Sequence, residues 1–285
     1  MLRTWLSVEG ISRRYSGRPV FRDVWFGVER GEFVALIGHS GCGKTTILNI
    51  LAGLEAPDSG TIVMDGREVS GPALDRAVIF QSHALLPWLT ALGNVAFAVR
   101  SRHRGWPKAK VQDHARRVLD LVGLSDAVLR KPAELSGGMK QRVGIARALA
   151  VEPSLLLMDE PFSALDALTR GTLQDEVLRL VSDAGQTAFM ITHDVDEAIL
   201  LVDRILLMTN GPDARMAEVV VNTLPRPRDR RTIHRTPGHY AMRNHIVDFL
   251  VTRSRTLAGA RPEGWDGRHV PEVRPAASII EETIS

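Results

Sequence analysis

Short apolar runs alternate with longer amphipathic stretches along most of the chain. Each run holds a few consecutive apolar residues next to turn residues, which is typical of a strand buried on both faces. The runs lie at residues 33–37, 77–80, 155–158, 187–192 and 204–208. Helical patterns lie between several of them, so the sequence predicts an α/β fold with a largely parallel sheet and helices on both of its faces.

Two other regions have their own patterns. Residues 6–10 alternate, 21–28 are apolar and aromatic, and 61–64 lie between turn signals, which predicts a β-rich region before and after the first helix. From 87 to 151 the period becomes helical and predicts an inserted helical subdomain. Apolar side chains on one face of this insert, before the terminating Gly123, are Val111, Ala115, Val118, Leu119 and Val122.

Two helices are expected after the run at 155–158. The first covers about 166–184, and the second begins directly after the strand that ends near His193. Asp194 and Glu197 have the spacing of a capping box, in which each side chain bonds the backbone N–H of the other residue. They therefore mark the start of the second helix.

The C-terminal part divides into a helix and a tail. Met242, Ile246, Phe249 and Leu250 fall on one helical face, so we expect a terminal helix that docks on the core through them. Beyond Arg255 the chain becomes rich in Pro, Gly and Arg, and we expect a mobile tail there.

Composition and charge limit the function classes. The 285 residues are 44% hydrophobic and 24% charged, which is ordinary for a globular protein with a sizeable core. No apolar run approaches the roughly 18 residues of a membrane span, and no secretory signal is recognisable, so we expect a cytoplasmic protein. The single cysteine, Cys42, excludes an internal disulfide. Basic residues gather after Leu224 without interleaved aromatics, which favours a solvated segment over a nucleic-acid contact.

A glycine-rich segment joins the run at 33–37 to a helical pattern. Backbone N–H groups of such a loop can point at closely spaced phosphate oxygens beside a helix N-terminus. The lysine then reaches the β and γ phosphates, and the hydroxyl that follows it ligates Mg²⁺. The sequence therefore predicts a site for ATP and Mg²⁺ rather than a simple glycine turn. Its residues are Gly38, His39, Ser40, Gly41, Cys42, Gly43, Lys44, Thr45 and Thr46, with Thr45 on the metal.

Two acidic residues, Asp159 and Glu160, follow the apolar run at 155–158. Doubly wound sheets bind their ligands at the C-terminal ends of their strands. We expect Asp159 to hold the metal, directly or through water, and Glu160 to polarise the attacking water as general base. The alternative is an exposed turn with two carboxylates, which the nearby phosphate motif disfavours.

A second glycine motif, residues 135–142, opens another helix. A serine and two glycines at a helix start, here Ser136, Gly137 and Gly138, make another anion site. The motif resembles the signature of the ATP-binding cassette family, in which two subunits pair head to tail. The resemblance implies that these residues cover the γ-phosphate bound to the other subunit.

Further residues match the family in the expected order. The resemblance implies that Tyr15 stacks on adenine, that Gln81 senses the metal and the attacking water, and that His193 contacts the γ-phosphate. It also implies that the loop containing Asp166 crosses the dimer interface. Glu160, His193, Gln81 and Lys44 are thus the expected catalytic residues, and Thr45, Gln81 and Asp159 the expected metal ligands.

The same resemblance implies a domain plan. The family fold is a P-loop NTPase with a RecA-like, mostly parallel core, an antiparallel β-subdomain and an inserted helical subdomain. On this plan residues 1–230 form the ATPase domain, with the core at 1–86 and 152–225 and the helical insert at 87–151. Residues 231–285 then hold the C-terminal helix and the tail.

Three segments resemble one subgroup of the family in particular. Residues 38–45, 85–90 and 224–230 look like those of ATPases that energise importers of nitrate, sulfonates and taurine, and His39 with the segment 240–250 looks most similar to the nitrate and cyanate type. The implied partners are integral membrane permease subunits, an extracytoplasmic solute-binding protein and a second ATPase subunit, with no nucleic acid. The implied location is the cytoplasmic face of the inner membrane. A sulfonate or taurine importer, or a soluble ATPase acting on nucleic acid or assembly machinery, remains the alternative.

Overall fold

The computed structural model describes residues 4–183, 185–259 and 268–275. Within these ranges a seven-stranded sheet has the order β11–β10–β9–β3–β8–β7–β6. The five strands from β9 to β6 run parallel, and β10 is antiparallel to β9. The predicted α/β fold with a largely parallel sheet is therefore confirmed. The strands are β3 (Phe33–Ile37), β6 (Arg76–Ile79), β7 (Leu155–Asp159), β8 (Thr187–Ile191), β9 (Arg204–Met208), β10 (Met216–Val221) and β11 (Glu272–Val273).

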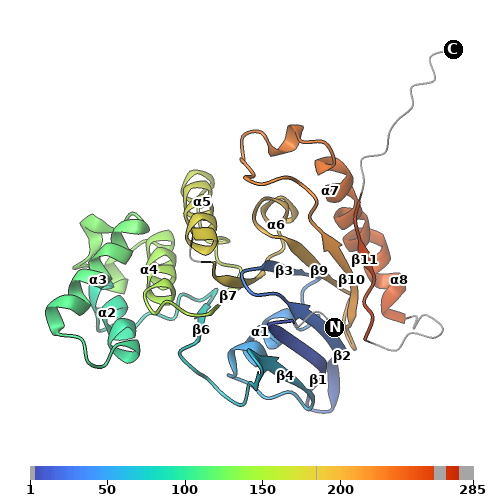
Figure 1. Ribbon diagram of the computed structural model, residues 1–285, viewed down its shortest axis with the longest axis horizontal. Helices are drawn as coiled ribbons and strands as arrows, with labels where there is room; N and C mark the ends of the chain where they lie inside the picture. Colours follow the sequence, from blue (N-terminus) through green and yellow to red (C-terminus); the bar gives the residue numbers. More distant parts are fainter. Residues whose placement is uncertain (1–3, 184, 260–267, 276–285) are drawn as a thin grey trace.

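A second, antiparallel sheet contains the β-rich opening of the chain and has the order β2–β1–β4–β5. Its longest strands, β1 (Leu6–Tyr15) and β2 (Arg18–Val28), form a hairpin in which Leu6 lies opposite Val28. The others are β4 (Ser59–Met64) and β5 (Arg67–Glu68). Figure 1 shows this sheet beside α1, below the central sheet.

The helices form three groups in Figure 1. α2 (Ala91–Arg102), α3 (Lys108–Leu121) and α4 (Gly137–Leu149) lie together at one end, and the face predicted for the insert is buried there. α5 (Ala167–Asp183) and α6 (Val195–Leu201) cover one face of the sheet. α1 (Lys44–Ala52) lies on the other face, while α7 (His239–Asp248) and α8 (Ser254–Gly259) pack at the β10 edge.

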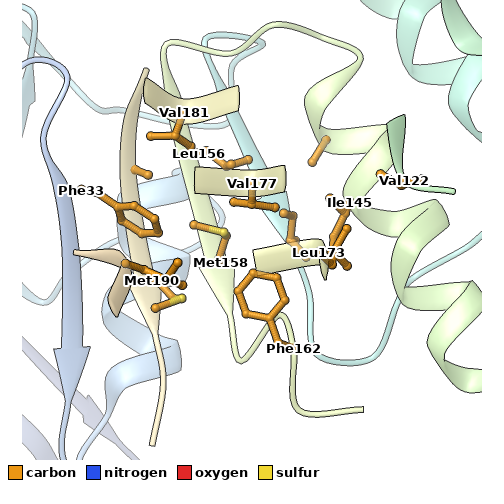
Figure 2. Close-up of a cluster of buried hydrophobic side chains, with 14 of the residues drawn as sticks. Phe33, Val122, Ile145, Leu156, Met158, Phe162, Leu173, Val177, Val181 and Met190 are labelled. Carbon is orange, nitrogen blue, oxygen red and sulfur yellow. The ribbon is translucent and has the colours of Figure 1, made fainter. Parts of the chain in front are cut away.

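Alternate side chains of the central strands belong to two different cores. In β3, Phe33 packs in the core that contains α5, while its neighbour Val34 packs in the core that contains α1. This alternation follows from the twofold period of a strand that is buried on both faces. Figure 2 shows Phe33 with Leu156, Met158 and Met190 meeting Leu173, Val177 and Val181 of α5.

The C-terminal helix docks as expected, because Met242, Ile246 and Phe249 are fully buried. The prediction of a mobile tail beyond Arg255 is wrong for the described part of that segment. α8 continues to Gly259, and β11 adds a short parallel strand to the free edge of β10. A two-residue strand leaves almost no periodic signal in a sequence, which explains the error. Residues 260–267 and 276–285, also part of the predicted tail, lie outside the described residues.

Candidate active site

The glycine-rich loop connects β3 to α1, at the C-terminal edge of the parallel sheet. Gly43 caps α1 in the left-handed region with φ of 95°, and among the described residues this helix start has no side-chain cap hydrogen bond. A Cβ on Gly43 would lie 2.7 Å from side-chain atoms of both Val20 and Phe21, so only glycine fits. Free N–H groups at a helix N-terminus, beside a loop without bulky side chains, fit a phosphate anion.

Lys44 and Thr45 begin the helix and point into the site. Lys44 Nζ donates to the carbonyl oxygens of Gly38 at 2.8 Å and of His39 at 2.9 Å, so the ammonium group lies against the loop itself. Thr45 Oγ1 donates to Asp159 Oδ2 at 3.0 Å, which joins the helix to the end of β7. The predicted phosphate and metal residues are thus brought together from the ends of β3 and β7, the two strands on either side of β8.

Burial shapes the chemistry of the Asp159 carboxyl. Desolvation raises its pKa, and the nearby Glu160 carboxylate acts in the same direction. The Thr45 hydroxyl and the Lys44 ammonium oppose this by stabilising the charged form. A buried carboxylate in this setting gains from a bound cation.

Glu160 lies at the centre of the predicted catalytic residues. Gln81 Nε2 donates to Glu160 Oε2 at 3.1 Å, and His193 Nδ1 lies 3.4 Å from Glu160 Oε1. The Glu160 backbone has φ of 46°, a left-handed conformation that is strained for a non-glycine residue, and its N–H donates to Ile191 O. Three segments far apart in the sequence therefore converge on one carboxylate.

The second glycine motif forms the N-terminus of α4, where Ser136 Oγ accepts from Met139 N at 3.2 Å. A Cβ on Gly138 would lie 3.1 Å from Leu165, the neighbour of Asp166, so the two motifs meet within one chain. Asp166 caps α5 by accepting from Thr169 N, which holds the pKa of its carboxyl below the usual range. Gln141 of α4 reaches Pro161 O at 2.8 Å and so joins this group to the segment after Glu160.

For three predicted site residues, the structure describes a contact or a degree of burial that does not involve the predicted phosphate and metal residues. Tyr15 is 44% exposed, and its hydroxyl donates to Glu55 rather than to the glycine loop. The ring of His39 donates through Nε2 to Leu250 O at 2.6 Å, so its side chain contacts the C-terminal helical segment. Cys42 is fully buried, which raises the pKa of its thiol and fits a structural role.

The capping box predicted at α6 is only half formed. Asp194 accepts from Glu197 N at 3.0 Å as expected, but the Glu197 side chain turns inward instead of back to the cap. There it accepts from Thr192 and from the buried Gln174. Sequence reasoning missed this buried polar group, although Gln174 interrupts the otherwise apolar face of α5 formed by Leu173 and Val177.

Residues 21–163 match the sequence profile of the family described as ABC transporter, which is half of the chain. The chain belongs to the ABC transporter family. No helix in the described part of this family member is long and apolar enough to cross a membrane.

Several ABC proteins resemble this chain over most of its length. The nitrate import ATP-binding protein NrtC of Synechococcus elongatus is 50% identical over 234 residues, which are 82% of this chain but 36% of NrtC. The nitrate transport protein NasD of Klebsiella oxytoca is 47% identical over 262 residues, covering 90% of this chain and 100% of NasD. The bicarbonate transport ATP-binding protein CmpD of Synechocystis is 46% identical over 253 residues, covering 87% and 90%. The chain therefore spans about a third of NrtC and nearly all of NasD and CmpD.

A solved structure supports the ABC fold. The ATP-binding cassette MJ0796, described as a dimer in a post-hydrolysis state bound to ADP and phosphate, superposes with a TM-score of 0.71. Its sequence is 29% identical, and the match covers 76% of this chain and 98% of MJ0796.

Gly43→Ala should damage the predicted phosphate loop. The new Cβ would meet Val20 and Phe21 in a backbone conformation that costs an L-residue about 1–2 kcal/mol before any clash. We expect a lower Tm and at least tenfold weaker ATP binding by calorimetry, because the loop must shift. Gly66→Ala is the matched control, since Gly66 also has positive φ but has open space around it. Equal ATP affinity in both variants would show that the close approach at Gly43 is unimportant.

Proposed function

We propose that this chain is the ATP-hydrolysing subunit that energises an importer of a small anion, most directly nitrate. The convergence of Gln81, His193 and Glu160 beside Lys44 and Asp159 carries the proposal. It supports a general base next to a phosphate and metal site at the end of β7. The names and lengths of NasD and CmpD support a transport ATPase over essentially this whole chain.

ATP would bind with its β and γ phosphates in the loop 38–46. The N–H groups at the start of α1 and the Lys44 ammonium would neutralise the phosphate charge. Tyr15 is exposed and would offer its ring to adenine. This assignment uses Gly38, His39, Ser40, Gly41, Cys42, Gly43, Lys44, Thr45 and Thr46 of one chain.

The residues present fit a magnesium ion. Thr45 and Asp159 already place two oxygen atoms together, and Gln81 supplies an amide oxygen from the neighbouring strand end. Within the described residues no three acidic, histidine or cysteine side chains form a metal cluster. Mg²⁺ commonly uses few protein ligands and completes its shell with phosphate oxygens and water, where it neutralises phosphate charge.

Glu160 would accept a proton from the attacking water. His193 and Gln81 hold its two carboxylate oxygens from opposite segments, so the base is oriented before water arrives. His193 is exposed and would be available to the γ-phosphate.

A second copy of the chain would complete the site. Ser136, Gly137 and Gly138 form a helix N-terminus in the helical region, apart from the loop at α1. One ATP has no use for two such anion sites in the same chain, whereas two chains paired head to tail would each offer the motif to the partner's γ-phosphate. Asp166 would then lie at the subunit interface, as the dimer described for MJ0796 supports.

The transported anion would pass through other polypeptides. We propose integral membrane permease subunits and an extracytoplasmic solute-binding protein as partners, with this chain at the cytoplasmic face of the inner membrane. Exposed apolar side chains on the helical side support a permease contact: Trp88 is 66%, Phe97 57% and Leu129 71% exposed. Closure of the ATPase pair would move this surface and the segment 81–90.

Bicarbonate is the second candidate solute, because CmpD resembles the chain nearly as closely as NasD. Sulfonates and taurine remain weaker alternatives from the sequence. The test is reconstitution of this chain with its permease and solute-binding protein in proteoliposomes, with ATPase activity measured against each anion. Stimulation by nitrate and not by bicarbonate, cyanate or taurine supports the proposal. Stimulation by bicarbonate alone would replace nitrate, and stimulation only by nucleic acid would contradict import.

A further inference from the structure

A cavity of about 830 Å³ lies between α5, α6 and the segment 226–231. Its arginines are Arg179, Arg226, Arg228, Arg230 and Arg231, and its acidic residues are Asp175 and Asp229. Asp175 pairs with Arg230 and Asp229 with Arg231, while Glu176 and Asp203, just outside the lining, pair with Arg179 and Arg226. Five guanidinium groups against these four carboxylates leave one positive charge in excess, that of Arg228. The sequence favoured a solvated basic segment here, but the structure folds this segment against two helices.

Arg228 is the arginine of this cavity whose charge is least compensated. Within the described residues its hydrogen bonds go only to backbone carbonyl oxygens, those of Val202 at 2.7 Å and Leu224 at 3.3 Å. The Asp203 carboxylate, whose charge also acts on Arg228, accepts a hydrogen bond from Arg226 instead. Burial and the charge of Arg226 lower the pKa of Arg228 to about 10. A bound anion would stabilise this partly desolvated guanidinium.

Arg230 connects the same cavity to the predicted catalytic loop. Its Nη2 donates to Gln174 Oε1, and Gln174 Nε2 donates to Glu197 Oε1. Glu197 accepts from Thr192, whose Oγ1 accepts in turn from Asp194 N at 3.0 Å. His193 lies between Thr192 and Asp194, and its ring is 3.4 Å from Glu160. A buried polar chain thus links an arginine in the cavity to the loop that holds His193.

We propose that this cavity binds a small, multiply charged phosphate anion, and that the anion weakens the Arg230–Gln174 contact and displaces the His193 loop. Arginine forks match phosphate oxygens in a bidentate manner, and several of them suit a ligand with more than one charge. Phosphate oxygens compete with Gln174 Oε1 for Arg230. The Gln174 amide then loses one hydrogen-bond partner, which weakens its hydrogen bond to Glu197. Hydrolysis then slows. The effect on hydrolysis rests on the proposed ATPase function, whereas binding does not.

Calorimetry with pyrophosphate tests the binding step. The full chain carrying Lys44→Ala is used so that the phosphate loop contributes little heat. We expect saturable binding that Arg228→Gln weakens at least about tenfold, as expected for loss of a charged hydrogen bond. Arg231→Gln, at an exposed position, should also weaken binding if Arg228→Gln proves unstable. Arg104→Gln, an exposed arginine outside the cavity, should leave the affinity unchanged. No saturable binding, or equal affinity in all variants, overturns the site.

A second experiment distinguishes a soluble phosphate from a lipid headgroup as the ligand of the cavity. Flotation with vesicles containing phosphatidic acid asks whether a lipid headgroup occupies the cavity. Pyrophosphate binding without Arg228-dependent flotation assigns a soluble phosphate. Arg228-dependent flotation that pyrophosphate reverses assigns a headgroup of the same chemistry.

Steady-state ATPase kinetics at constant free Mg²⁺ test the coupling. Pyrophosphate that competes with ATP at the phosphate loop raises only KM for ATP. Pyrophosphate bound in the cavity should instead lower kcat, by about fivefold for a coupling free energy of typical size. Gln174→Met should bind pyrophosphate at least as tightly as the unmodified chain, because Arg230 no longer has to leave Gln174, but it should lose the effect of pyrophosphate on kcat. A change in KM alone, or the same fall in kcat for Gln174→Met, contradicts the coupling. A protein without any ATPase activity would refute the proposed function while the calorimetric result on the cavity stands.

Discussion

Glu160→Gln should reduce ATP hydrolysis by a factor on the order of 100 to 10,000 while ATP stays bound, because removal of a general base commonly costs that much. Glutamine keeps the shape of the side chain and can still bond Gln81 and His193, but it cannot accept a proton from water. Single-turnover hydrolysis and ATP binding are the measurements. Bound ATP that is not cleaved is the expected state.

Glu152→Gln is the matched control for this change. Glu152 is also a glutamate in the left-handed region, with φ of 48°, but it is exposed and precedes β7, whereas Glu160 follows the other end of this strand. It should hydrolyse ATP at the unmodified rate. A Glu160→Gln protein that turns over ATP normally would show that another group is the base.

Lys44→Ala should instead weaken ATP binding. Loss of one charge-assisted hydrogen bond to phosphate costs about 2 kcal/mol, which is roughly a thirtyfold loss of affinity. Hydrolysis should fall with it, because the γ-phosphate loses the cation that neutralises it. Calorimetry with a non-hydrolysable ATP analogue measures the first effect directly.

Lys108→Ala removes an exposed lysine of α3 and should bind the analogue normally. The Gly38 and His39 carbonyl oxygens that Lys44 contacts would remain in place, since they belong to the loop backbone. Retention of both tight binding and turnover by Lys44→Ala would contradict the phosphate assignment.

The sequence predicted the central fold well because strands buried on both faces leave continuous apolar runs. β3, β7 and β8 are fully buried along their length and were located to within a residue or two. It also predicted which residues meet near Glu160, since parallel strands present their C-terminal ends at one edge. Gln81 and His193 were predicted from their positions in the order of the family's motifs, because a single glutamine or histidine carries little signal by itself.

The errors come from features without local periodicity. The short pairing of β11 with β10 and the fold of 226–231 against α5 depend on surfaces that only the assembled sheet and helices create. Glu197 was predicted to cap a helix, but tertiary partners at Thr192 and Gln174 outcompete the local bond. Such buried polar pairs become visible only once the elements are packed.

The proposal that two copies of the chain share each ATP site is tested most directly by measuring the mass of the protein. Light scattering after size exclusion, with and without ATP, gives this mass. The Glu160→Gln chain of 31.4 kDa should double its mass in ATP and return to a monomer when nucleotide is removed. With Ser136→Arg added it should still bind ATP but remain monomeric, because the second anion site can no longer cover the partner's γ-phosphate. A Glu160→Gln chain that binds ATP yet never doubles its mass, or one that pairs equally well with Ser136→Arg, would contradict a site divided between two copies.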